Sequence, residues 1–177
     1  MPSGLQLQSA IVAASDTDWR NYFRQTVTQW GFQALVSRTG REAEDRARST
    51  TVGLVILGML MPNISAAHAC VHIRGLRSYL ATPIIICMLG DDPEIRAAAT
   101  RAGASLVLKF PLSTFDLTQE IFPLLGQTAE IPHASAEWQR LQEPLPLYGE
   151  SRVLAQGRQA LNRERQSYSP RRMNWQS

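Results

Sequence analysis

Short apolar runs separated by longer amphipathic segments constrain the fold of this 177-residue chain more than any other feature. Each run has the length of a strand, and the most strongly apolar of them spans Val52–Leu57. Strands that lack polar alternation are typical of a parallel sheet that is buried on both faces. The alternation therefore predicts an α/β protein in which helices cover both faces of a parallel sheet.

Five strands and five helices are expected before residue 126. The strands are expected at 10–14, 32–36, 52–57, 83–88 and 105–108. Helices are expected after Ser15 or Asp16 up to Gly31, at 40–49, at 65–79, from Asp92 to about Gly103, and from Ser113 or Thr114 to about Leu125, with capping residues marking several starts. In a doubly wound sheet of order 2-1-3-4-5, the ligand crevice lies at the carboxyl ends of strands one and three. The residues after Val12 and after Leu57 would line it.

An ordered set of short motifs resembles the receiver domain of bacterial response regulators. The motifs are Met61-Pro62 after the third strand, Pro83-Ile84-Ile85-Ile86 in the fourth, the turn Arg101-Ala102-Gly103-Ala104, and Pro111. Their order and spacing match over about residues 9–125, or two-thirds of the chain. The resemblance implies a flavodoxin-like, five-stranded parallel sheet of order 2-1-3-4-5.

The same resemblance implies that the phosphorylation chemistry of the family is lost. Receivers hold Mg²⁺ with two acids after the first strand and carry an acceptor Asp, a switch Thr or Ser, an aromatic switch residue and a Lys. The matching positions here hold Ala14 and Ser15 with Asp16 just beyond, then Gly58, Met88, Val107 and Phe110. The only lysine, Lys109, lies one residue before the Lys position, and a one-residue shift would restore it while displacing Pro111. Phosphorylation would need Asp16 as acceptor, so we expect an aspartate-less pseudo-receiver that is no enzyme and uses no cofactor.

Other chemistry-bearing residues have simpler structural explanations. His68 and His72 have the i, i+4 spacing of a helical metal pair, with Cys70 between them, but no third ligand lies at a predictable distance. We expect a helix face there and no metal site. Asp91 and Asp92 precede Pro93, where Asp92 caps a helix. Trp19 could lie in the core or beside the crevice.

The pattern changes after Gly126, so we divide the chain into a receiver-like domain, 1–126, and an extended arm, 127–177, with a helix near 150–166. Residues 151–177 hold six arginines against one acid, Glu164. Aromatic anchors with arginines around them suit a protein interface. The expected partner-binding residues are Trp138, Tyr148, Arg152, Arg158, Arg163, Arg165, Tyr168, Arg171, Arg172 and Trp175.

These features favour a non-enzymatic, phosphorylation-independent protein-interaction module, an accessory subunit docked on a larger assembly through its arm. The alternative is a signalling or transcription accessory protein whose Arg-rich tail binds nucleic acid. Anionic membrane surface is a third target, as a peripheral contact only. The N-terminus lacks the pattern of a signal peptide, and no apolar run is long enough to span a membrane. We therefore expect a cytoplasmic protein.

Overall fold

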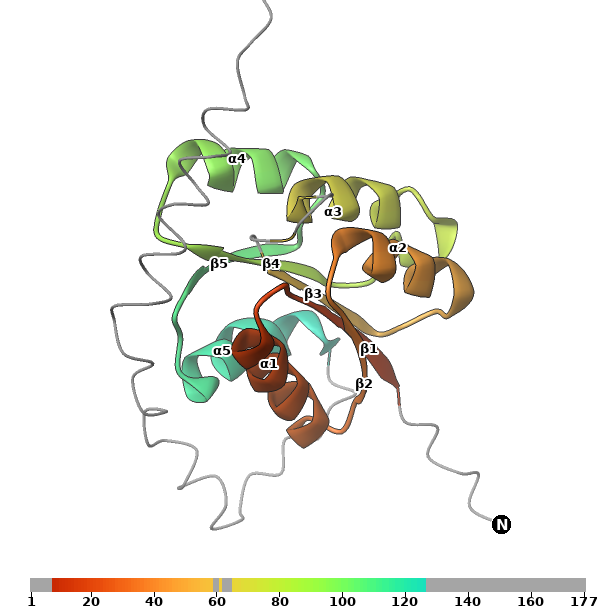
Figure 1. The fold of residues 1–177 in the computed structure, drawn as a ribbon, viewed down its shortest axis with the longest axis horizontal. Coiled ribbons are helices and arrows are strands. Elements are labelled where there is room, and N and C mark those ends of the chain that lie inside the picture. The colour runs from red at the N-terminus through yellow and green to blue at the C-terminus, as the bar shows by residue number, and fades with distance from the viewer. Residues whose placement is uncertain (1–7, 59–60, 62–64, 127–177) are drawn as a thin grey trace, which may run out of the picture. The chain divides into compact units, whose positions relative to one another are not determined.

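The computed structural model describes residues 8–58, 61 and 65–126, which form a five-stranded parallel sheet (Figure 1). The strand order is β2-β1-β3-β4-β5, which confirms the doubly wound topology expected from the sequence. The strands are β1 (Ser9–Ala13), β2 (Gln33–Ser37), β3 (Leu54–Gly58), β4 (Ile84–Leu89) and β5 (Leu106–Phe110). The expected arm, 127–177, lies outside the described residues.

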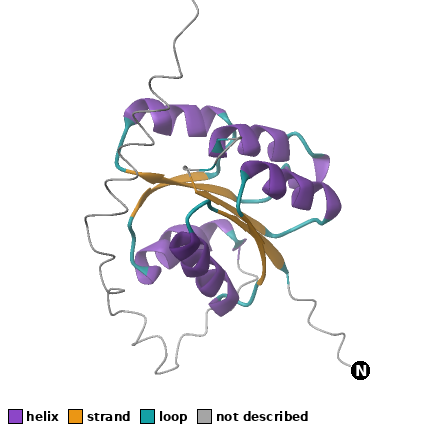
Figure 2. Ribbon diagram, viewed as in Figure 1, coloured by secondary structure: helices purple, strands orange, loops and turns teal. Residues whose placement is uncertain are grey.

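Helices cover both faces of the sheet, as Figures 1 and 2 show. One face carries α2 (Gly40–Ser49), α3 (Ala66–Arg74) and α4 (Pro93–Arg101), and the other carries α1 (Thr17–Gln29) and α5 (Thr114–Ile121). Two 3₁₀ helices, η1 (Arg77–Tyr79) and η2 (Phe122–Leu124), follow α3 and α5. Within the described residues, no helix is both long and apolar enough to cross a bilayer.

Side chains at the start of each α-helix accept hydrogen bonds from its first N–H groups. The capping residues are Asp16, Thr39, Ser65, Asp92 and Ser113. Such caps satisfy backbone donors that have no partner within the helix. The expected start at Asp92-Pro93 is confirmed.

Most element ends differ by one or two residues from the sequence expectation, and three differences have a clear structural cause. The expected helix 65–79 ends at Arg74 and resumes as η1, which buries Tyr79 and lets its hydroxyl donate to the Thr50 carbonyl. The last α-helix ends at Ile121 and tightens into η2 around Pro123, which has no N–H for an α-helical bond. β5 continues beyond Leu108 because Lys109 and Phe110 pair with the end of β4. The first and third differences reflect tertiary contacts that hydropathy alone does not reveal, whereas the second has a local cause.

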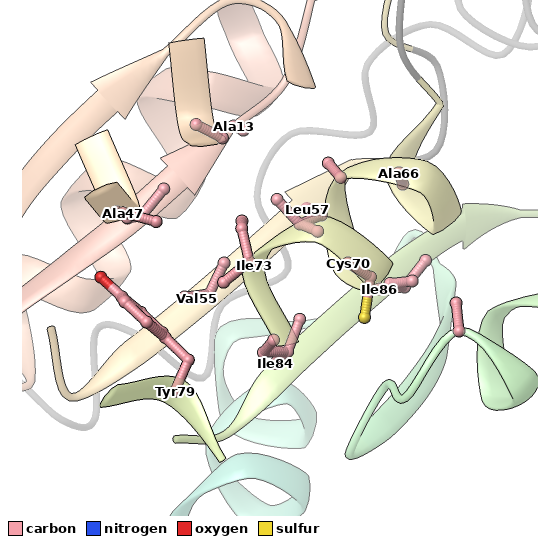
Figure 3. Packing of buried hydrophobic residues seen from close by; sticks show 14 of the residues in the cluster. Ala13, Ala47, Val55, Leu57, Ala66, Cys70, Ile73, Tyr79, Ile84 and Ile86 are labelled. Atoms are coloured by element: carbon pink, nitrogen blue, oxygen red, sulfur yellow. The ribbon is translucent and has the colours of Figure 1, made fainter. Parts of the chain in front are cut away.

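Two apolar clusters hold the helices to the sheet. The first lies beneath α2, α3 and α4 and contains Leu57, Ile73, Tyr79 and Ile86, all fully buried (Figure 3). The second lies beneath α1 and α5 and includes Phe23 of α1 and Leu117 of α5. Strands buried on both faces explain the continuous apolar runs of the sequence.

Candidate functional site: a filled cleft at the carboxyl edge of the sheet

The carboxyl ends of β1 and β3 lie in close contact with each other. Ala13 pairs with Leu57, which brings the next residues, Ala14 and Gly58, into contact. A Cβ atom on Gly58 would lie 3.2 Å from the Ala14 Cβ and 3.3 Å from the Ala13 carbonyl oxygen. Both distances are tighter than ordinary van der Waals contact. The backbone is therefore packed closely where the family resemblance places a phospho-accepting side chain.

Phe110, at the end of β5 where the family resemblance places a lysine, packs against the aromatic side chains of α1. Its side chain belongs to the cluster beneath α1 and α5, and the residue is only 7% exposed. The Phe110 ring centroid lies 4.3 Å from that of Trp19, 5.4 Å from that of Tyr22 and 5.3 Å from that of Phe23. The Tyr22 hydroxyl also donates to the Leu112 carbonyl at 3.2 Å, which ties α1 to the chain after β5. An aromatic cluster thus surrounds the position where the resemblance places the lysine of the site, and Trp19 is its partly buried member.

Lys109 lies on the opposite face of β5 from Phe110. Successive side chains of a strand point to opposite faces, and Phe110 faces α1 and α5. Lys109 therefore shares the face of Val107, which packs against the cluster beneath α2, α3 and α4, and it is exposed. Met88, at the expected switch position, is fully buried and brings no hydroxyl to the cleft. Shifting the alignment to the family motif by one residue therefore places Lys109 at the lysine position by name only, because its side chain lies on the other face of the strand.

The loop between β1 and α1 is closed by a guanidinium group. Arg20 Nη1 donates to the Ala14 carbonyl at 2.8 Å and to the Ser15 carbonyl, and Arg20 Nη2 donates to the Thr17 hydroxyl at 2.9 Å. Asp16 Oδ1 accepts from the backbone N–H groups of Asp18 and Trp19, so this carboxylate caps α1. Sequence reasoning missed Arg20, whose only signal is its place one turn after the capping residue.

The residues present do not fit a magnesium site. Mg²⁺ needs oxygen ligands in near-octahedral geometry, usually including carboxylates. Ala14 and Gly58 supply no side-chain oxygen, Asp16 is engaged as a helix cap, and Arg20 adds a positive charge to the same loop. No group of three or more His, Cys, Asp or Glu residues suited to a metal ion occurs in the described part of the chain.

Each of the two apolar clusters contains one buried cysteine, Cys70 beneath α2, α3 and α4 and Cys87 beneath α1 and α5. Burial raises the pKa of the Cys70 thiol to about 11 and that of the Cys87 thiol to about 12. Both thiols therefore stay protonated near neutral pH, and a protonated thiol is neither a good nucleophile nor a metal ligand. Cys70 lies inside the cluster in Figure 3, on a different side of α3 from exposed His68 and His72.

The His72 side chain on α3 forms a hydrogen bond with the Glu44 side chain on α2. Its Nδ1 atom lies 2.7 Å from Oε1 of Glu44, whose side chain is only 7% exposed. We expect His72→Ala to lower the free energy of unfolding by about 1 to 2 kcal/mol, because it leaves a nearly buried carboxylate without this partner. Urea denaturation measures the loss. A double-mutant cycle with Glu44→Ala isolates the pair.

His68 supplies the matched control for that measurement. It lies one turn earlier on the same helix and is exposed, and its side chain forms no hydrogen bond or ion pair with a described residue. His68→Ala should change the free energy of unfolding by less than about 0.5 kcal/mol. Equal losses in the two alanine variants would contradict a stabilising role for the Glu44–His72 pair.

Comparison with known proteins agrees with this architecture. The family model for the response regulator receiver domain matches residues 10–122. Two relatives named response regulator MprA, from Mycolicibacterium vanbaalenii and Mycobacterium tuberculosis, are each 27% identical over 118 and 127 residues, covering 67% and 72% of this chain. The matches cover only 50% and 54% of those regulators, so the chain spans about half the length of these relatives.

Solved structures show the same fold at lower sequence identity. The chemotaxis protein CheY4 of Vibrio cholerae superposes with a TM-score of 0.63 and 19% identity, covering 67% of this chain and 98% of that one. The receiver domain of the sensor histidine kinase PA1611 from Pseudomonas aeruginosa, solved with magnesium in its active site cleft, gives a TM-score of 0.63 and 16% identity, covering 68% and 98%. These likenesses establish the fold.

Proposed function

The chain belongs to the response regulator receiver family, and from that premise we propose that it is a receiver without phosphotransfer, which acts by binding a protein partner. Receivers work through contacts with other proteins, such as kinases and effector domains. A member that cannot be phosphorylated keeps the fold and its surfaces for such contacts. The proposed activity is therefore phosphorylation-independent and non-enzymatic.

The close packing of Gly58 against Ala14 carries this proposal. Phosphoryl transfer needs a nucleophilic carboxylate and a cation that neutralises the charge of the transferring group. Gly58 has no side chain, and a Cβ added there would meet Ala14 at 3.2 Å. The guanidinium of Arg20 closes the neighbouring loop, and Phe110, at the position of the family's lysine, packs against Trp19. Several independent replacements thus support the loss of the chemistry.

Incubation with acetyl phosphate and Mg²⁺ should leave the mass of the intact protein unchanged. Addition of beryllofluoride and Mg²⁺ should also leave its melting temperature unchanged, because a ligand stabilises a protein only where the folded state binds it. Intact-mass spectrometry and a thermal melt measure the two outcomes.

Asp16 provides the control for this experiment. It is the carboxylate nearest in sequence to the two missing acids, and it has a structural task as the cap of α1. A stable phosphoryl adduct on the natural chain that disappears in Asp16→Ala would overturn the proposal. An adduct that survives in Asp16→Ala would also overturn it and would place the acceptor elsewhere.

We further assign the partner contact to the C-terminal arm and propose that the protein is a subunit of a larger assembly. The support is compositional, since residues 151–177 combine six arginines with Tyr168 and Trp175. Purification of the native protein at moderate salt should recover a defined partner. A lone monomer with a protease-sensitive tail would contradict the assembly. Nucleic acid would instead show a steep dependence on salt and competition by unrelated sequences.

A further inference from the structure

A ridge along the amino edge of the sheet combines positive charge with an exposed apolar side chain. We define the ridge as the described segments 46–53, 75–83 and 101–105, which follow or end α2, α3 and α4. These helices run antiparallel to the strands and cover one face of the sheet, so their carboxyl ends share one edge (Figure 1). The ridge lies at the opposite edge of the sheet from the filled cleft.

Hydrogen bonds show that the three segments are neighbours. The Tyr79 hydroxyl donates to the Thr50 carbonyl, which joins the second segment to the end of α2. The Arg74 guanidinium reaches the Gly103 carbonyl at 2.9 Å and the Thr82 carbonyl at 2.8 Å, which joins the second segment to the end of α4. The segments therefore form one continuous surface.

The ridge carries four positive charges and no negative one. Its charged residues are Arg46, Arg48, Arg77 and Arg101, all exposed, and the three segments contain no Asp or Glu. None of the four arginines forms an ion pair with a described residue. Positive side chains at helix carboxyl ends complement the helix dipole. That effect alone does not explain an apolar side chain held out among them.

Leu80 is that side chain. It is 70% exposed, more than any other large hydrophobic residue in the described part of the chain, and it directly follows η1 between Arg77 and the Thr82 turn. Cations around an exposed aliphatic group are typical of peripheral membrane contacts, in which the apolar group enters the interface and the cations pair with lipid phosphates. Long arginine side chains suit such a surface because the aliphatic stem and the charged head occupy different depths.

Several backbone carbonyls of the ridge are already engaged, which makes them less available to a peptide. The carbonyls of Tyr79, Leu80, Thr82 and Gly103 already accept hydrogen bonds from Arg74. The groups that remain available for binding are therefore the dispersed arginine side chains and the apolar side chain of Leu80. This combination matches a planar anionic surface better than an extended acidic segment. We infer that the ridge binds anionic phospholipid headgroups, with Leu80 entering the interface.

Vesicle sedimentation of the full chain tests this inference. We expect binding to vesicles that contain phosphatidylglycerol and much weaker binding to phosphatidylcholine alone. Arg77→Gln with Arg101→Gln should reduce partitioning roughly 25-fold, at about five-fold for each charge. Leu80→Ser should reduce it about ten-fold without changing the charge. None of these three side chains forms a hydrogen bond with a described residue, so the variants should fold. A thermal melt of each variant verifies this.

A matched control separates the ridge from net charge and from the arm. Arg24 and Arg38 are exposed and lie outside the ridge, so Arg24→Gln with Arg38→Gln makes the same change in charge. The arm is identical in all variants. Equal losses in the control and ridge variants, or binding to no vesicle, would overturn the inference. Failure to bind vesicles together with ridge-dependent binding of polyglutamate would overturn it in favour of an acidic protein.

Discussion

Phe110→Lys, which installs the residue type that the family resemblance expects, should destabilise the protein by about 3 kcal/mol or more. Phe110 is 7% exposed and contacts the rings of Trp19, Tyr22 and Phe23. The substitution removes those aromatic contacts and leaves an ammonium group with no acid at Ala14 or Gly58 to pair with it. Urea denaturation, followed by far-UV circular dichroism, measures the loss.

Lys109→Ala is the matched control, because Lys109 is the neighbouring residue but is exposed on the other side of the strand. It should change the free energy of unfolding by less than about 0.5 kcal/mol. Trp19 should report the same difference by fluorescence, since its ring lies against Phe110. A Phe110→Lys protein as stable as the natural chain would show that the cleft is open and hydrated, which would contradict the filled site.

The fold could be predicted because its signals are local. Uninterrupted apolar runs such as Val52–Leu57 predict buried parallel strands, and the Asp92-Pro93 start is a capping pattern that the structure confirms. The extent of the third helix was wrong because its end depends on Tyr79 reaching Thr50, a contact between residues 29 positions apart. Propensity within a segment contains no information about such a contact.

The sequence could predict which residues occupy the candidate site but not how those residues pack. The ordered motifs assign Gly58 and Phe110 to positions of the phosphorylation site, and the expectation that no acceptor carboxylate is present rests on that assignment. The sequence left open whether the emptied cleft forms an exposed patch or is closed by its own side chains. The structure shows Ala14, Gly58, Met88 and Phe110 all buried. Closure depends on the approach of α1 to β5, which a pattern of residue types does not determine.

Arg74 is a second residue whose importance follows only from tertiary structure. It lies in the last turn of α3, where a basic residue is expected to complement the helix dipole. Its side chain instead joins three parts of the chain. The guanidinium donates to the carbonyls of Tyr79, Leu80, Thr82 and Gly103 and to the Ser105 hydroxyl. Loss of this group would leave several partly buried carbonyls without a donor.

Arg74→Met should therefore lower the free energy of unfolding by about 3 kcal/mol. A hydrogen bond to a charged group is worth about 1.5 to 3 kcal/mol, and the bonds of a single guanidinium are not additive. Arg74→Lys should recover only part of the loss, because an ammonium group cannot reproduce the planar fork of the guanidinium. Arg77→Met, an exposed arginine three residues later, is the control and should have little effect. In Arg74→Met, amide hydrogen exchange should become faster at Ser105 and Ile84. The Ser105 N–H donates to the Ile84 carbonyl and the Ile84 N–H donates to the Ser105 hydroxyl, next to the groups that Arg74 binds. If Arg74→Met matched Arg77→Met in stability and exchange, the guanidinium would not hold the ends of α3 and α4 together, and the ridge would need another explanation for its continuity.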